Sequence, residues 1–245
     1  MHPLRASLLL LAILAMPAAL ADGHLLELRD QLDDAVIRGN GDRIAALADA
    51  FADEDGALAD YYAAYAHYRL GELYFENNKR GKKYLNECID ILKPVVKSDA
   101  AFGEAHALLE TCYGVSAPFY MLRAATRGVA ANGEMEKALK ADPDNPRVML
   151  AEGISLYFRP GAFGGDKERA KQRIAEALER FSDYQPVRAD GPVWGEAEAW
   201  LYLARIARDE GNDDVVLEAF GRSLSAAPSF KAAQTAVAEY LSQPV

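Results

Sequence analysis

Apolar residues recur every three or four positions along almost the whole chain, and polar residues with Gly or Pro interrupt this pattern at short intervals. Spacing of this kind places the apolar side chains on one face of an α-helix. Hardly any segment alternates as a strand would, so the sequence predicts an all-α fold of antiparallel helices joined by short breaks. The expected helices span 24–38, 42–54, 57–77, 81–97, 101–115, 117–128, 132–141, 146–158, 166–181, 195–210, 213–226 and 230–242.

One stretch, from Ala197 to Phe230, carries a repeat motif without a gap. Its marker residues have the spacing of the tetratricopeptide repeat: a Trp, a Leu with a small residue, a Gly between the helices, an aromatic residue and a closing Pro. These are Trp200, Leu203, Ala204, Gly211, Phe220 and Pro228. The stretch therefore resembles a tetratricopeptide repeat.

The segment 146–181 resembles a second copy, with a turn that is lengthened by about five residues within 159–165. Gly153 takes the place of the glycine that lets two helices pack closely. Core positions of the second helix are Ala170, Ile174 and Ala177. The long turn ends in Gly-Gly-Asp, and Pro192-x-Trp194-Gly195 precedes the last repeat; together they look like a subgroup of bacterial periplasmic and envelope tetratricopeptide proteins.

This resemblance implies a right-handed α-solenoid of helical hairpins with capping helices. We expect a single helical-repeat domain over 22–245, with about four repeats over 57–230. Residues 22–56 would form an N-terminal capping hairpin. Residues 231–245 would form a C-terminal capping helix, which a repeat array needs because its last repeat exposes an apolar face.

The first 21 residues differ from the rest of the chain. A single cation, Arg5, precedes an apolar run from Leu8 to Ala15, and the segment ends in Ala19-Leu20-Ala21. This order is typical of a secretory signal peptide, which predicts cleavage after Ala21 and a periplasmic or secreted protein. No later segment resembles a membrane-spanning helix, so we expect no integral membrane segment after cleavage.

Charge and residue chemistry narrow the function. The chain has 27 basic and 37 acidic residues, a net charge of −10, which disfavours nucleic acids and anionic membrane surfaces as partners. No nucleophile motif, phosphate-binding loop, dinucleotide fingerprint or metal-ligand spacing occurs. The sequence therefore predicts a protein without enzymatic activity, metal site or cofactor.

The first helix of each repeat would line a concave groove, and its residues are largely aromatic and aliphatic. The candidate groove residues are Tyr65, Tyr68, Phe75, Leu150, Ile154, Tyr157, Phe158, Leu201 and Arg205. Such a groove suits a segment of a partner protein, and the chain would then be a periplasmic binding or scaffold protein. Alternatively, a closed pocket would carry a small hydrophobic, lipid-like ligand for an envelope transport system. A third interpretation is that some of these residues pack against the insertions as core.

Cys88 and Cys112 are the two cysteines of the chain. They fall on neighbouring helices of adjacent repeats, so a disulfide between them is geometrically allowed in an oxidising compartment. Two buried free thiols are the alternative.

Overall fold

The computed structural model describes residues 16–242, with side chains from residue 23 onward. In this range the chain is built from α-helices and short 3-10 helices, and no strand occurs. The elements are α1 (Met16–Ile37), α2 (Gly41–Ala52), α3 (Ala57–Leu73), α4 (Asn78–Ser98), α5 (Gly103–Ser116), η1 (Ala117–Phe119), η2 (Met121–Arg123), α6 (Ala124–Ala141), α7 (Pro146–Phe158), η3 (Gly161–Phe163), α8 (Lys167–Phe181), α9 (Glu196–Asp209), α10 (Asp213–Ala226) and α11 (Lys231–Leu241).

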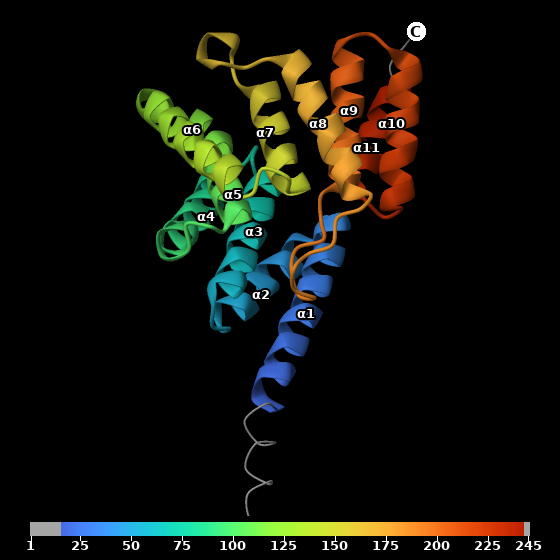
Figure 1. The fold of residues 1–245 in the computed structure, drawn as a ribbon. Coiled ribbons are helices and arrows are strands. Elements are labelled where there is room, and N and C mark those ends of the chain that lie inside the picture. The colour runs from blue at the N-terminus through green and yellow to red at the C-terminus, as the bar shows by residue number, and fades with distance from the viewer. Residues whose placement is uncertain (1–15, 243–245) are drawn as a thin grey trace, which may run out of the picture.

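Successive helices pack as antiparallel pairs, and the pairs stack into a curved, tetratricopeptide-like array (Figure 1). The predicted all-α solenoid is confirmed. Side-chain caps begin several helices; the carboxylate of Asp166, for example, accepts the free backbone amide of Arg169 at the start of α8, as its position predicted. None of the helices in the described range is long and apolar enough to cross a membrane.

The pair α7–α8 shows how the repeat motif directs packing. Ala170, Ile174 and Ala177 are fully buried on one face of α8, which confirms their predicted place in the core. A Cβ on Gly153 would lie 2.6 Å from the Ile174 side chain, so only glycine allows α7 and α8 to approach this closely.

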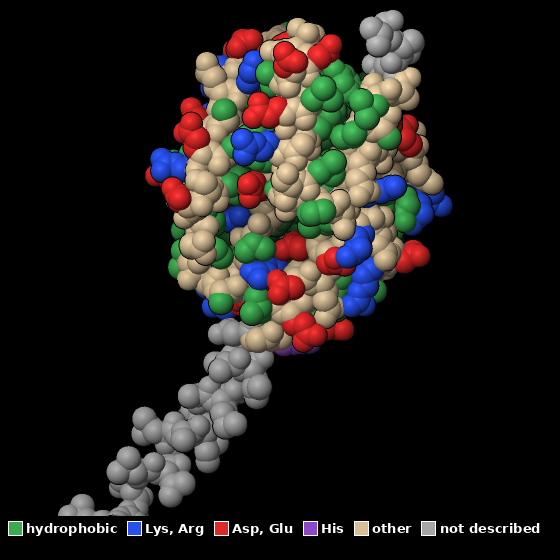
Figure 2. Space-filling model, turned by 90° about the vertical axis from the view of Figure 1, so that its right-hand side faces the viewer, with side chains coloured by type: hydrophobic (Ala, Val, Ile, Leu, Met, Phe, Trp, Pro, Cys, Tyr) green, Lys and Arg blue, Asp and Glu red, His purple; other side chains and the backbone are tan. Residues whose placement is uncertain are grey.

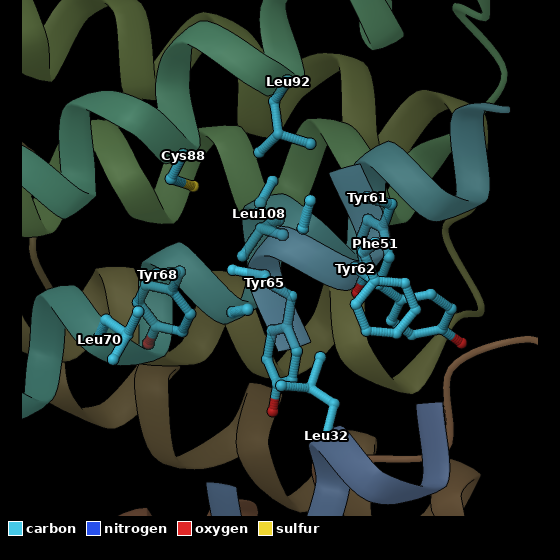
Figure 3. Close-up of a cluster of buried hydrophobic side chains, with 14 of the residues drawn as sticks. Leu32, Phe51, Tyr61, Tyr62, Tyr65, Tyr68, Leu70, Cys88, Leu92 and Leu108 are labelled. Carbon is cyan, nitrogen blue, oxygen red and sulfur yellow. The ribbon is translucent and has the colours of Figure 1, made fainter. Parts of the chain in front are cut away.

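The core of the N-terminal half is unusually rich in tyrosine. Figure 3 shows the rings of Phe51, Tyr61 and Tyr62 lying together, while Tyr65 points toward Leu32 of α1. All of these side chains are buried. The helix α3 is thus covered on several sides, because α2, α4 and α5 all pack against it.

The predicted helix over 132–141 is confirmed as the second part of a longer helix, whereas the predicted helix over 117–128 and the break after it are wrong. The structure has two 3-10 turns, η1 and η2, followed by one continuous helix, α6. Gly128 and Gly133 lie inside α6, where each costs only about 1 kcal/mol relative to alanine. Burial of Ala131, Met135 and Ala138 against neighbouring helices holds the helix together.

The expected leader lies mostly outside the described residues, since residues 1–15 are not described. Helix α1 begins at Met16 and includes Ala21, the expected cleavage site. Cleavage after Ala21 therefore stays a prediction.

At the other end of the array, α11 packs on α10. Figure 2 views this side of the molecule and shows hydrophobic side chains gathered near the C-terminal residues. Leu217 of α10 and Leu241 of α11 are exposed there.

Candidate functional site

A long connection between α8 and α9, residues 182–195, crosses the array and reaches helix α1 (Figure 1). One guanidinium nitrogen of Arg29 in α1 donates hydrogen bonds to the carbonyl oxygens of Ala189 (3.0 Å) and Gly191 (2.7 Å). The hydroxyl of Tyr62 in α3 donates to the carbonyl oxygen of Asp190 (2.6 Å). We call residues 182–195 the crossing loop.

The end of the crossing loop is anchored by an aromatic stack. The indole of Trp194 lies on the ring of Tyr65, with centroids 4.7 Å apart. Nη1 of Arg147 in α7 donates to the carbonyl oxygen of Trp194 at 3.3 Å. Gly195 then turns the chain into α9 with φ of +122°, and a Cβ there would lie 2.6 Å from the Phe181 ring, so this corner requires glycine.

The crossing loop and four helices surround a small cavity. It offers about 20 Å³ to water-sized molecules, which is enough for one water. A lipid or another ligand of that size does not fit. The lining residues are Tyr61, Tyr68, Glu104, Ala107, Leu108, Thr111, Arg147, Leu150, Ala151, Ile154, Trp194 and Glu198.

Four buried polar atoms on lining residues have no hydrogen-bond partner within the described part of the chain. They are Tyr61 Oη, Glu104 Oε2, Arg147 Nη2 and Trp194 Nε1. Buried polar groups normally have a partner, and these four atoms offer hydrogen bonds that a water molecule in the cavity can make.

Two ion pairs, one buried and one half-buried, border the cavity. Nε of Arg147 lies 2.9 Å from Oε1 of Glu104, and the side-chain amide of Asn145 donates to the same oxygen at 2.6 Å. In the second pair, Arg69 of α3 lies 2.7 Å from Glu198 of α9. Burial lowers the pKa of Arg69, but Glu198 and Glu72 outweigh burial and hold the pKa above its usual value. Because Arg69 lies on α3 and Glu198 on α9, the second pair joins repeats that are far apart in the sequence.

Two acids, Asp33 on α1 and Glu110 on α5, have raised pKa values because of burial. Burial raises the pKa of Asp33 to about 7, although Arg29 lowers it, and neither carboxylate oxygen has a hydrogen-bond partner in the described structure. Burial also raises the pKa of Glu110 to about 7, against the lowering effects of Ser155 and Arg159. Three or more His, Cys, Asp or Glu side chains that could hold a metal ion do not meet anywhere in residues 16–242.

The structure distributes the candidate groove residues over three environments. Tyr65, Tyr68, Leu150 and Leu201 are buried, with Tyr65 and Leu150 only 1% exposed. Tyr68, Leu150 and Ile154 line the cavity. Their burial fits the third interpretation, in which residues of the first helices pack against an insertion as core. Here the insertion is the crossing loop, which covers Tyr65.

The remaining candidates lie nearer the surface. Tyr157 and Phe158 cluster with Tyr202 of α9, where Phe158 is 62% exposed and the Arg205 guanidinium lies over the Tyr202 ring. Phe75 lies in the turn between α3 and α4, where its ring packs 4.9 Å from that of Phe119.

Cys88 of α4 and Cys112 of α5 form a disulfide in the structure, with Cα atoms 6.4 Å apart. The bond joins the second helix of one pair to the first helix of the next. It lies in the N-terminal core and away from the cavity lining.

Sequence reasoning missed the crossing loop as part of the site. Pro192, Trp194 and Gly195 were noted only as a family-like signature, and Arg29 was not singled out. The available signal was length, since loops above about twelve residues inside a compact domain are uncommon and usually have a role of their own.

None of the family models and none of the curated proteins matches this sequence. Two solved structures resemble the fold. The HusA haemophore from Porphyromonas gingivalis is 21% identical, with a TM-score of 0.61 over 76% of this chain and 92% of that one. TTC0263, a thermophilic tetratricopeptide protein of Thermus thermophilus, is 18% identical, with a TM-score of 0.63 over 90% of this chain and 98% of that one. These likenesses establish a tetratricopeptide-like, all-α fold.

Proposed function

We propose that this chain is a non-enzymatic binding protein of the cell envelope whose concave face holds a segment of a partner protein. The observation that carries this proposal is the way the concave face holds the crossing loop. Side chains of α1, α3 and α7 donate hydrogen bonds to four backbone carbonyl oxygens of the loop. These belong to Ala189, Asp190, Gly191 and Trp194. Three of these carbonyls lie in a turn that the hydrogen bond from the Gly191 amide to the Arg188 carbonyl closes. Because every peptide offers such carbonyls, a surface of this kind recognises the backbone of a bound segment.

The crossing loop occupies this face as a partner segment would. Trp194 supplies the aromatic side chain that stacks on Tyr65. A partner segment that displaces the loop would need an aromatic residue at the same place and a turn with free backbone carbonyls beside Arg29. Aromatic anchors of this type commonly dominate binding energy.

An envelope location is supported by two features. The first 21 residues have the pattern of a secretory leader. The disulfide between Cys88 and Cys112 is of a kind that persists in oxidising compartments.

The test uses a labelled synthetic peptide of residues 182–195 and the full chain carrying Trp194→Ala. Loss of the indole should loosen the chain's own loop, so the peptide should bind the variant and not the unaltered protein. A peptide with alanine in place of its tryptophan is the matched control and should not bind. Absence of peptide binding to a variant whose loop amides have become exchangeable would rule out the proposal.

Native mass spectrometry of the protein isolated from its own envelope then distinguishes the occupants. A bound chain supports the partner-segment function. A bound mass of lipid size supports the second candidate described next.

The second candidate is a carrier of a small hydrophobic ligand, bound on the cluster of Tyr157, Phe158 and Tyr202, of which Phe158 is exposed. The name of one structural neighbour, a haemophore, favours this class. Haemin absorbance titration is the direct probe. Phe158→Asp should abolish binding, whereas Phe163→Asp, at an equally exposed phenylalanine outside the cluster, should not. Leu150 is unsuitable for this test, because an aspartate at a buried position would unfold the chain.

A further inference from the structure

A second surface, distinct from the concave face, combines exposed apolar side chains with cations that form no ion pair with any described residue. Met121 and Leu122 of η2 are 90% and 101% exposed. Soluble domains rarely leave adjacent large apolar side chains this open, and such sites often mark contact with a protein or a membrane. We define the η2 patch as Met121, Leu122, Lys79, Lys82, Arg123 and Arg127.

The segment that carries Met121 and Leu122 is held firmly on α4. The ring of Phe119 packs against Phe75, and a Cβ on Gly81 would lie 3.3 Å from it. The hydroxyl of Tyr120 donates to the side-chain oxygen of Asn86 at 2.8 Å. These anchors on α4 and on the turn before it fix the segment, so the exposure of the next two residues is built into the fold.

Cations surround this apolar tip. The ammonium of Lys82 lies 4.2 Å from the centroid of the Tyr120 ring, and the Arg127 guanidinium lies 3.8 Å from it. Lys79 lies one turn before Lys82 on the same side of α4, and Arg123 directly follows Leu122. Within the described residues, none of these four cations forms an ion pair, although most of the other basic side chains of the array do.

We propose that the η2 patch docks on an anionic lipid surface, with Met121 and Leu122 entering the interface and the four cations lying at the headgroups. Charge complementarity selects this occupant: the whole chain carries −10, yet the cations of this patch have no acidic partner among the described residues. Apolar insertion together with clustered Lys and Arg is the chemistry that holds peripheral proteins on anionic bilayers. The net charge repels the rest of the molecule from such a surface, so docking would orient the chain with η2 toward the lipid.

The test is flotation of the full chain with vesicles of phosphatidylcholine alone or with about 30% phosphatidylglycerol added, so that the two vesicles differ in surface charge. Binding should require the anionic lipid and weaken as salt is raised. Replacing Lys79, Lys82 and Arg123 by Gln should weaken it by about fivefold per charge removed. Met121→Ser with Leu122→Ser should abolish it.

The matched control replaces Leu217 and Leu241, exposed leucines at the far end of the array, by Ser and should leave vesicle binding unchanged. Circular dichroism confirms that each variant is folded. Equal binding to neutral vesicles, or no binding to anionic ones, overturns the proposal. The proposal is also overturned if the chain does not bind vesicles but self-associates, and the Met121 and Leu122 variant no longer self-associates. The patch would then join two copies of the chain.

Discussion

The indole of Trp194 lies almost parallel to the ring of Tyr65, with 14° between their planes and 4.7 Å between their centroids. Tyr65 belongs to the second helical pair, and Trp194 directly precedes the last one. The stack therefore fixes the crossing loop in the position that a partner segment would take.

We expect Trp194→Ala to lower the free energy of unfolding by about 2–3 kcal/mol, somewhat less than for a fully buried tryptophan, because Trp194 keeps some exposure. Hydrogen exchange at the amides of residues 188–191 should accelerate. Trp200→Ala, a loss of the same side chain on α9, serves as control and should leave exchange in the crossing loop unchanged. Full protection of these amides in the Trp194 variant would contradict the anchoring role.

The buried pair of Glu104 and Arg147 should be far more sensitive to loss of one partner than a surface pair. Glu104→Ala leaves a buried guanidinium uncompensated, and we expect a loss of about 3–5 kcal/mol. Arg180→Ala, which breaks an exposed pair with Asp144, should cost under about 1 kcal/mol. Urea unfolding measures both, and similar costs for the two variants would show that the buried pair is not isolated from solvent.

The disulfide joins cysteines 24 positions apart, and for a loop of this length chain entropy predicts a stabilisation of about 3 kcal/mol. Cys88→Ala with Cys112→Ala should lower the free energy of unfolding by this amount. Thiol labelling of the denatured, unreduced protein should find no free thiol. Labelling of two thiols would show that the cysteines are reduced in the native compartment.

Stability should fall as pH rises through neutrality, because of Asp33. An unfolded aspartate titrates near 4, whereas in the fold the pKa is about 7, so the folded chain holds this proton over the intervening range. The contribution of Asp33 is fully present below about pH 4 and is lost as pH rises through about 7. Melting temperatures measured from about pH 5 to 8 should therefore decline, and Asp33→Asn should flatten the decline.

Asp34→Asn is the matched control for that experiment. Asp34 is the next residue on α1, is exposed, and pairs with Arg38 at the surface. The Asp34→Asn substitution should leave the dependence of the melting temperature on pH unchanged. An unaltered profile in the Asp33 variant would instead assign the pH dependence to Glu110, whose pKa is also about 7.

A helix was predictable from the sequence where it buries one amphipathic face against one neighbouring helix. In α8, Ala170, Ile174 and Ala177 recur at helical spacing and all three are buried. Capping by Asp166 was equally readable, because the acceptor and the amide lie three residues apart. Local signals of this kind predict where each helix lies, and their repetition along the chain predicts the all-α fold class.

The candidate site was predictable only in part, because its decisive contacts join distant segments. Helical register placed Tyr65 and Tyr68 toward the concave side, but it carried no information that Trp194 would cover Tyr65. The hydrogen bond from Arg29 to Gly191 spans 162 positions, and neither residue belongs to a repeat motif. In α6, the sequence predicts a break after Gly128 because the burial that outweighs the cost of a glycine is also non-local.

The crossing loop changes how the array should fold. In an open repeat protein each unit contacts only its neighbours, so the ends fray and the chain can unfold in sections. Here Arg29 in the first helix binds the segment just before the last full hairpin, and Arg69 pairs with Glu198 across a similar separation. These contacts connect the first helix and the second helical pair to the segment around α9. We therefore expect the two ends of the array to lose their native contacts together, so that the protein unfolds in one cooperative transition.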